Sequence, residues 1–234
     1  MPHSDHHRPR PIPAAGSGEP IKPAKPPRDR MILAATKLFR TQGVSGTGLR
    51  EIVAKANAPR GSLQHYFPGG KEQLVTEALQ FAGDFAGRRV NTLLDRMDDP
   101  TPGDLYAALA GEWRDLYLRE GFAEGCPLAA TAADTAGTSP TFRAVLSDAF
   151  DRWQRPLEAA LQRLGVPADR TPRLATLMIV GLEGSLIVAR SREDAGTIDA
   201  VIDELRPVLD AAVANRRGRR RRARQPRPAA SPSA

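Results

Sequence analysis

Small, polar and basic residues fall on one face of the short segment 60–67, RGSLQHYF. The other face has the i, i+3, i+4 apolar spacing of a helix, in Leu63, Tyr66 and Phe67. At 100° per residue, Gly61, Gln64 and His65 lie on the opposite side. Glycine permits close approach, and amide and imidazole groups form hydrogen bonds with phosphates and base edges. This face therefore has the chemistry of a surface that lies against nucleic acid.

A second short helix is expected just before this segment. Its apolar residues follow the i, i+3, i+4, i+7 pattern of one helix face: Leu49, Ile52, Val53 and Ala56. The sequence Asn57-Ala58-Pro59 interrupts the pattern, because proline lacks an amide donor and disfavours helical geometry in the residue before it. Two short helices around a four-residue turn predict a DNA-binding helix-turn-helix. The alternative is a tight helical corner in an all-α protein, since such corners are common.

The segments on both sides supply the rest of a three-helix unit. Residues 28–41 are expected to form a helix with one apolar stripe, made of Met31, Ala34, Ala35, Leu38 and Phe39. Gly43 ends this helix, and Thr47 in the following link is expected to cap the next one. After Phe67 the sequence Pro68-Gly69-Gly70 predicts a sharp turn, and Lys71 opens a long helix that continues to about residue 97.

These residues together resemble the N-terminal signature of the TetR family of one-component transcriptional regulators. The matching positions are Thr47, Glu51-Ile52-Val53, Arg60-Gly61-Ser62-Leu63, His65-Tyr66-Phe67 and Lys71-Glu72-x-Leu74. Most members have one residue fewer between the phenylalanine and the lysine than FPGGK has, and the longer spacing resembles the LmrA/YxaF repressors. Two later stretches, Gly125-Cys126-Pro127-Leu128 and Glu183-Gly184-Ser185-Leu186, resemble the C-terminal domain of the same subgroup.

The resemblance implies which side chains meet DNA. The expected contacts are Thr47, Arg60, Gly61, Ser62, Gln64, His65, Tyr66 and Lys71. Most of them are expected on phosphates, and the amides of Gly61 and Ser62 on phosphates or base edges. Gln64 is the expected base reader, because glutamine forms two hydrogen bonds with adenine. Many family members carry tyrosine at this position.

The composition and the charge distribution of the chain agree with a DNA-binding protein. The chain has 234 residues, and Cys126 is its only cysteine, so neither an internal disulfide nor a multi-cysteine metal site is expected. No signal peptide is visible, and the apolar run 177–182 is too short for a membrane span, so a cytoplasmic protein without a membrane partner is expected.

The net charge differs between segments of the chain: it is +3 over residues 1–30, +4 over 31–75, −8 over 76–215 and +8 over 216–234. The basic segments predict a part of the protein that binds nucleic acid, and the acidic body is expected not to contact the nucleic acid.

Beyond residue 97 the chain predicts more helices and no alternating strand pattern. The expected helices are 105–119, 127–135, 141–164, 173–191 and 197–215. The expected fold is all-α, with a disordered Pro-rich arm (1–27), a three-helix DNA-binding domain (28–74), a helical-bundle domain for ligand binding and dimerisation (75–215) and a disordered Arg-rich tail (216–234).

The last two helices predict a homodimer. The segment 173–191 is apolar on nearly every side, whereas 197–215 has a single apolar stripe. A helix that is apolar all round is difficult to cover within one small domain, so a second copy is expected to complete a four-helix bundle. Gly181 and Gly184 are expected to allow close backbone approach. The alternative is that both helices belong only to the core of one chain.

The body is expected to sense a small molecule rather than to catalyse a reaction. Outside the N-terminal arm the only histidine is His65, and no triad, zinc motif or phosphate loop is present, so no enzyme, cofactor or metal is expected. Six aromatic residues are candidates for an apolar cavity: Trp113, Tyr117, Phe122, Phe142, Phe150 and Trp153. The resemblance implies a repressor that a small hydrophobic or aromatic ligand releases from a palindromic operator. The alternative is an architectural or partner-binding DNA-binding protein without an effector.

Overall fold

The computed structural model describes residues 25–135 and 137–223, with side chains described up to residue 213. This part of the chain forms helices joined by turns and contains no strand. The helices are α1 (Pro27–Gln42), α2 (Leu49–Lys55), α3 (Ser62–Tyr66), α4 (Gly70–Leu94), α5 (Pro102–Glu120), α6 (Pro127–Thr135), α7 (Pro140–Arg163), α8 (Thr171–Arg192) and α9 (Gly196–Ala223). The predicted all-α class is confirmed.

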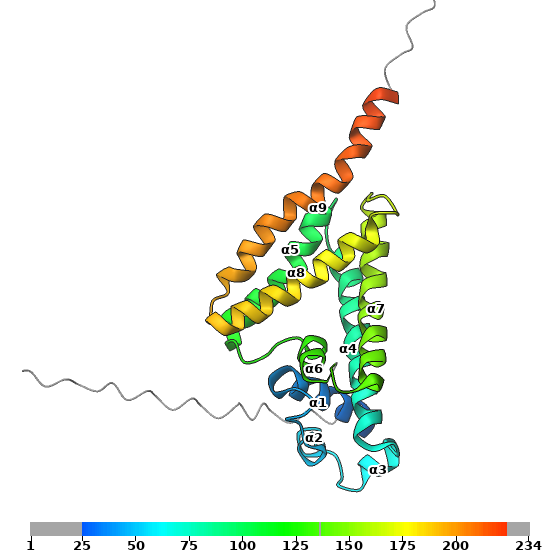
Figure 1. Ribbon diagram of the computed structural model, residues 1–234, viewed down its shortest axis with the longest axis vertical. Coiled ribbons are helices and arrows are strands. Elements are labelled where there is room, and N and C mark those ends of the chain that lie inside the picture. The colour runs from blue at the N-terminus through cyan, green and yellow to red at the C-terminus, as the bar shows by residue number, and fades with distance from the viewer. Residues whose placement is uncertain (1–24, 136, 224–234) are drawn as a thin grey trace, which may run out of the picture.

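The helices form an elongated molecule with the short helices at one end (Figure 1). α2 and α3 lie at that end, beside α1 and the first turns of α4. α4 and α7 run side by side along the length of the molecule, and α5, α8 and α9 pack into the other half. The long helix α4 therefore connects the predicted helix-turn-helix to the body.

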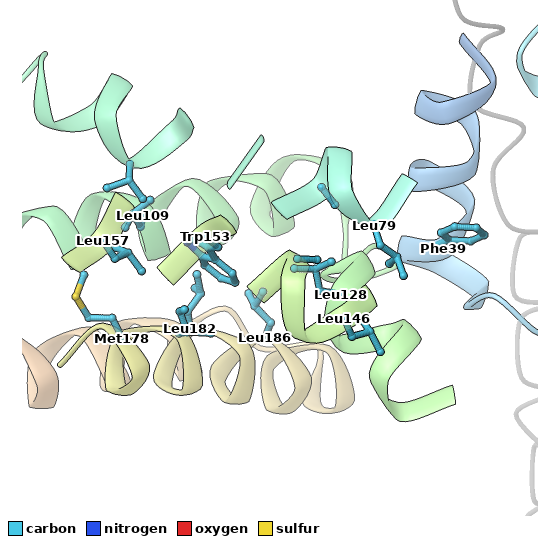
Figure 2. Close-up of a cluster of buried hydrophobic side chains, with 14 of the residues drawn as sticks. Phe39, Leu79, Leu109, Leu128, Leu146, Trp153, Leu157, Met178, Leu182 and Leu186 are labelled. Carbon is cyan, nitrogen blue, oxygen red and sulfur yellow. The ribbon is translucent and has the colours of Figure 1, made fainter. Parts of the chain in front are cut away.

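One hydrophobic core extends from α1 to α9, and α4 passes through both halves of it. Figure 2 shows Phe39 of α1 and Leu79 of α4 at one end of this core, with Trp153, Leu182 and Leu186 farther along it. Phe39 and Leu79 are fully buried. Because the core is continuous, movement of the body relative to α1 and α4 must rearrange packed side chains.

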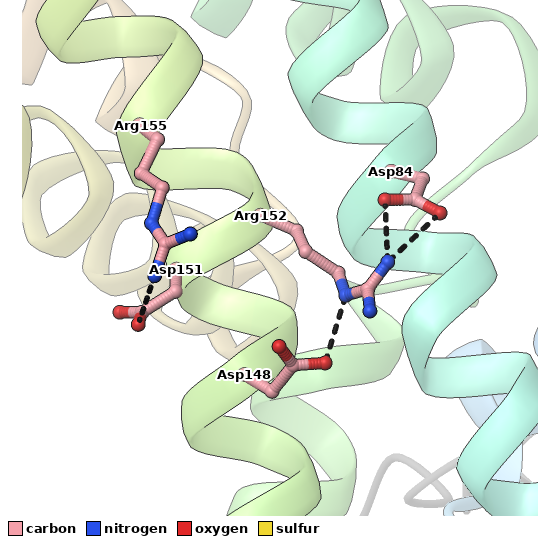
Figure 3. Close-up of polar contacts among 5 residues, drawn as sticks. All are labelled: Asp84, Asp148, Asp151, Arg152 and Arg155. Carbon is pink, nitrogen blue, oxygen red and sulfur yellow. Dashed lines mark hydrogen bonds and ion pairs between the residues drawn. The ribbon is translucent and has the colours of Figure 1, made fainter.

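The contact between α4 and α7 is close because two glycines of α4 face α7. A Cβ added at Gly83 would lie 2.3 Å from the carbonyl oxygen of Ala149, and one at Gly87 would lie 2.6 Å from the carbonyl oxygen of Arg152. Beside this contact, the Arg152 guanidinium bridges Asp84 of α4, at 3.1 Å, and Asp148 of α7, at 2.7 Å (Figure 3). The sequence interpretation did not identify this contact.

Several predicted boundaries are wrong. α3 has only 5 residues, because the turn after α2 extends to Gly61 and Phe67 leaves helical geometry with φ −131° and ψ 71°. α5 begins at Pro102, where Thr101 and Asp104 form a capping box. α9 continues to Ala223 rather than Asn215, so the predicted tail from residue 216 begins as helix; arginine is a good helix former, and no proline occurs between Pro207 and Pro226. Residues 1–24 of the predicted arm and 224–234 of the predicted tail lie outside the described residues.

α8 meets the length and hydropathy criteria for a membrane span, a test that core helices of proteins without spans also pass. One side of α8 is buried by α7 and α9, with Leu174, Met178, Leu182 and Leu186 in the core. Another side carries exposed apolar residues, including Val180 at 61% and Ile187 at 58% exposure. α8 is thus covered within the chain on only part of its surface.

Candidate nucleic-acid interface and effector cavity

Four of the eight predicted DNA contacts are exposed on the outer face of α3 or just before it. Arg60, Gly61, Gln64 and His65 are exposed. On the inner side, Leu63 and Tyr66 are partly buried against the core, and Phe67, which follows the helix, is fully buried. The predicted separation of an outer polar face from an inner apolar face is present in the structure.

Gly61 occupies an open position at the start of α3. Its φ of −81° is ordinary for any residue, and an added Cβ would meet nothing within 4 Å. Neither backbone conformation nor internal packing requires glycine here, so the absent side chain leaves space outside the molecule. The neighbouring Ser62 is half-buried, and its hydroxyl donates to the Pro59 carbonyl at 2.6 Å, inside the turn.

Thr47 does not have the role that the sequence predicts. The residue at the N-terminal cap of α2 is Gly48, and no side chain caps this helix. Thr47 is 1% exposed, and its hydroxyl donates to the Gly43 carbonyl at 2.6 Å. The capping prediction is wrong by one residue. The buried hydroxyl stabilises the α1–α2 link and is not placed to reach a phosphate.

Lys71 is half-buried at the start of α4, where its ammonium group donates to the Val44 carbonyl at 2.8 Å. The interaction ties α4 to the α1–α2 link, and an ammonium group has further donors for a second acceptor. The preceding Gly70 has φ +66°, in the left-handed region that favours glycine. The extra residue in FPGGK therefore supplies the turn that sets Lys71 in this position.

A buried arginine that the sequence interpretation missed supports the helix-turn-helix. Arg30 of α1 is 7% exposed, and its guanidinium donates at 2.8 Å each to the carbonyls of Lys25, Ala56 and Asn57. The last two are carbonyls at the end of α2, where Asn57 adopts a left-handed φ of 47°. Arg30 thus satisfies carbonyls that the end of a helix leaves free. The only sequence signal is its position one turn before Ala34 in the apolar stripe.

Replacing Arg30 with leucine is expected to lower the free energy of unfolding by about 2–3 kcal/mol, because buried carbonyls lose charged hydrogen-bond donors. Urea unfolding followed by circular dichroism measures this change. Arg28→Leu is the control: Arg28 is 44% exposed and pairs with Glu77 at 2.7 Å, so its loss is expected to cost less than about 1 kcal/mol. Equal effects of the two substitutions would contradict the role assigned to Arg30.

A cavity of about 290 Å³ lies between the predicted helix-turn-helix end and the body. Its wall is mainly apolar and comes from α1, α4, α5, α7, α8 and the start of α6. Aromatic rings from three helices line it: Phe81, Phe85, Trp113 and Trp153. Since α1 and α4 belong to the wall, a molecule in this cavity would contact the helices that carry the helix-turn-helix.

The six aromatic residues predicted for a cavity do not gather in one place. Trp113 and Trp153 line this cavity. Tyr117 is 1% exposed and packs between Trp113 and Phe122 in the core, with ring centroids 6.2 and 5.0 Å away. Phe142 lines a separate surface pocket beside Lys71, and Phe150 lines neither. Tyr117, Phe122, Phe142 and Phe150 therefore do not line this cavity. Helical spacing does not show which face of a helix meets a void.

Glu183 of α8 is a charged residue of the wall for which the sequence interpretation predicted no role in a cavity. Both of its carboxylate oxygens are buried, and among the described residues no nitrogen or oxygen donor lies within hydrogen-bond distance of them, so the weak Cys126 thiol is the donor beside them. Burial raises the pKa of Glu183 to about 7, and the neighbouring Cys126 thiol offsets only part of that increase. Burial and the Glu183 charge raise the pKa of Cys126 well above its usual value. A carboxyl group that is near half-ionisation at neutral pH therefore lies in a mainly apolar wall.

Arg40 of α1 joins the cavity to the chain segment that leads into α6. Its guanidinium lies 4.9 Å from the Trp113 ring centroid, pairs with Glu124 at 2.9 Å and donates to the Gly125 carbonyl at 3.2 Å. The backbone amide of Gly125 donates in turn to the Arg40 carbonyl at 2.9 Å. One side chain thus contacts the cavity and holds the first helix of the DNA-binding end against the body.

A short outer helix on a three-helix end, joined by a long helix to a helical body with a cavity, defines the class of helix-turn-helix transcriptional regulators. Two family models match the chain. Residues 32–78 match the model described as bacterial regulatory proteins of the tetR family. Residues 102–204 match the model described as the C-terminal domain of LmrA/YxaF-like transcriptional regulators.

Relatives agree with these matches, and a solved structure shares the fold. The regulator Rv0196 of Mycobacterium tuberculosis is 33% identical over 195 residues, covering 81% of this chain and 97% of that protein. LmrA of Bacillus subtilis is 30% identical over 168 residues, covering 72% of this chain and 88% of that protein. A TetR regulator from Legionella pneumophila superposes with a TM-score of 0.68 at 17% identity, over 80% of this chain and 100% of that one.

The chain belongs to the TetR family of bacterial transcriptional regulators. It is a DNA-binding transcription regulator, and its relatives are regulators rather than enzymes. The family resemblance expected from the N-terminal motif and from the two C-terminal stretches is confirmed.

Proposed function

We propose that this protein is a homodimeric, cytoplasmic repressor that leaves a palindromic operator when a small hydrophobic or aromatic ligand enters the cavity. The observation that carries the proposal is the cavity wall, which is shared between α1 and α4 of the DNA-binding end and the helices of the body. A ligand that favours one arrangement of these helices shifts the population of states with that arrangement. Two relatives, DhaR of Mycobacterium sp. and KstR2 of Mycolicibacterium smegmatis, are described as repressors.

The exposed side of α8 supports the dimer. Its exposed apolar residues recur at helical spacing and are joined by one from α9: Leu177, Val180, Ile187, Val188 and Val208. Gly184 lies on the same side, and an added Cβ there would meet nothing within 4 Å. Gly181 instead faces α9, because its Cβ would lie 2.6 Å from Leu205. We assign the open side of α8, together with α9, to contact with a second copy.

Val180→Glu combined with Ile187→Glu is expected to convert the dimer to a monomer, because two charges would be buried in an apolar contact. Sedimentation equilibrium at micromolar concentration measures the mass against the 25.3 kDa of one chain. The matched control is Leu118→Glu, since Leu118 is 69% exposed on α5, outside this surface. If the wild type were a monomer, or if the double variant were still a dimer, this surface would not join two copies.

For DNA we propose that Arg60, Gly61, Gln64 and His65 form the contact surface, with Ser62, Tyr66 and Lys71 at its edge. In a dimer, two such surfaces reach successive major grooves when their separation is about 34 Å. The exposed position of Gln64 on the outer side of α3, away from the core, supports its proposed role as the base reader.

Gln64→Ala is expected to cost about 1–3 kcal/mol of binding energy on the preferred duplex and to relax the preference at one base pair of each half-site. The duplex is first selected from a random library with the wild-type protein, and the variant is then compared on the duplex and its single-base substitutions. Arg60→Ala serves as the comparison, because loss of a phosphate contact weakens all sequences alike. If Gln64→Ala also weakened every sequence equally, Gln64 would not read a base.

The second candidate is a DNA-binding architectural or partner-binding protein without an effector. Unlike the ligand-controlled repressor, such a protein would have no ligand that binds in the cavity and controls DNA binding. Quenching of Trp113 and Trp153 fluorescence by aromatic compounds reports entry into the cavity, because both rings line it. A compound that quenches both and releases the selected duplex supports the ligand-controlled repressor. If no compound both quenches the fluorescence and releases the duplex, the second candidate is favoured.

A further inference from the structure

The charges around the cavity are balanced except at one place. Three arginines in its wall each have a carboxylate partner: Arg40 with Glu124, Arg89 with Glu112 and Arg119 with Glu120. Glu183 is the remaining charged residue of the wall, and among the described residues it has no ion-pair partner and only the weak thiol donor of Cys126 beside it. The group that the wall lacks is therefore a positively charged hydrogen-bond donor.

The surrounding wall fits an aromatic body attached to such a donor. Phe81, Phe85, Trp113 and Trp153 supply aromatic faces and edges, and the aliphatic wall includes Leu109 and Leu182. Aromatic faces attract cations as well as other rings. The volume of about 290 Å³ suits a molecule of two or three rings rather than a long chain.

We propose that Glu183 is the recognition residue for the effector, and that the effector is an aromatic cation whose ammonium or amidinium group binds the Glu183 carboxylate while its rings lie among Trp113, Trp153 and the two phenylalanines. The inference rests on the proposed effector cavity and names its ligand class. In this structure neighbouring atoms cover both carboxylate oxygens, so the cation reaches them when the Glu183 side chain rotates toward the cavity. The energy gained is that of a buried charge that acquires its partner.

Three probes with the same ring system test the charge preference: 2-naphthylmethylamine, 2-naphthylmethanol and 2-naphthoate, which are positive, neutral and negative. Calorimetric titration without DNA is expected to give the amine at least about tenfold tighter binding than the alcohol, and the carboxylate the weakest binding. Equal binding of amine and alcohol would overturn the cation preference while leaving the cavity as an effector site. If none of the three bound, both the preference and the cavity's assignment to aromatic ligands would be wrong.

Two variants test whether Glu183 causes the preference for the amine. Glu183→Gln keeps the shape of the side chain and is expected to remove the preference for the amine, with binding of the alcohol changed less than about twofold. Glu112→Gln is the matched control, because Glu112 lines the same cavity but is paired with Arg89. It is expected to leave the amine preferred. If the preference were lost in the Glu112 variant and kept in the Glu183 variant, the assigned residue would be wrong.

The pH dependence provides a second readout. Amine binding to the wild type is expected to strengthen from pH 6 to 8, because the carboxyl group ionises with a pKa of about 7 while the probe keeps its charge. Other charged or titratable groups around Glu183 are Arg40 of α1, Arg89 of α4, Glu112, Tyr117 and Arg119 of α5, Cys126 and Arg190. The pKa of Tyr117 is raised to about 12 and that of Cys126 well above its usual value, so neither ionises in this range. The same pH dependence in Glu183→Gln would overturn the proposal.

Discussion

Replacing Gly83 with alanine is expected to lower the free energy of unfolding by about 2–3 kcal/mol, although the same change inside most helices is stabilising. The added Cβ would lie 2.3 Å from the Ala149 carbonyl oxygen, which belongs to the backbone of α7 and cannot rotate away. α4 and α7 must therefore separate, and the core between them loses contacts. The midpoint of urea unfolding, measured at a fixed protein concentration, reports the change.

Gly111→Ala provides the matched control in α5. Its added Cβ would meet only the end of the Arg114 side chain, at 3.8 Å, so the substitution is expected to raise the free energy of unfolding by up to about 1 kcal/mol. Opposite signs for the same chemical change would show that close approach of α4 to α7, rather than helix propensity, determines the residue at position 83. A stabilising effect of both substitutions would contradict the close contact.

Glu183→Gln is expected to make the protein more stable at pH 8 and to change the shape of its stability curve. The pKa of Glu183 is raised from 4.5 to about 7 in the folded protein, so the folded state binds the proton more tightly than the unfolded state. The stability that this group contributes is then fully present below pH 4.5 and is lost as the pH rises to about 7. The total loss is about 3 kcal/mol.

The measurement is the difference in unfolding free energy between wild type and variant at several pH values. The difference is expected to favour the variant progressively from pH 5 to 7 and then to become constant. Glu112→Gln is expected to show no such change over this range. A difference that does not vary with pH would mean that the Glu183 carboxyl group titrates near its ordinary value.

The parts of the fold that the sequence predicted are those governed by local patterns. The stripe from Met31 to Phe39 and the proline and glycine breaks of the body placed most helices, because periodicity and helix breakers act over a few residues. The ends of α3 and α9 were less predictable. The turn up to Gly61 and the non-helical backbone of Phe67, which precedes Pro68, shortened α3. The arginine-rich segment extended α9 as helix although it has no apolar face.

The candidate sites divide in the same way. The outer face of α3 follows from helical spacing, so Gln64 and His65 were placed correctly as exposed residues. The cap at Gly48 instead of Thr47 depends on the register of one residue. Arg30 and Glu183 act through partners or voids formed by distant segments, which one-dimensional patterns do not contain. The aromatic residues illustrate this point, since only Trp113 and Trp153 of the six candidates reach the cavity.

The position of Arg40 has a consequence for affinity measurements. Its guanidinium contacts the cavity through Trp113 and also fastens α1 to the backbone at Gly125. If occupancy of the cavity alters operator affinity through this residue, the coupling free energy must be the same in both directions. Operator DNA is then expected to lower the affinity of the protein for the effector by the same factor by which the effector lowers its affinity for the operator. The ligand concentration needed for half-saturation would consequently rise with the fraction of protein bound to DNA.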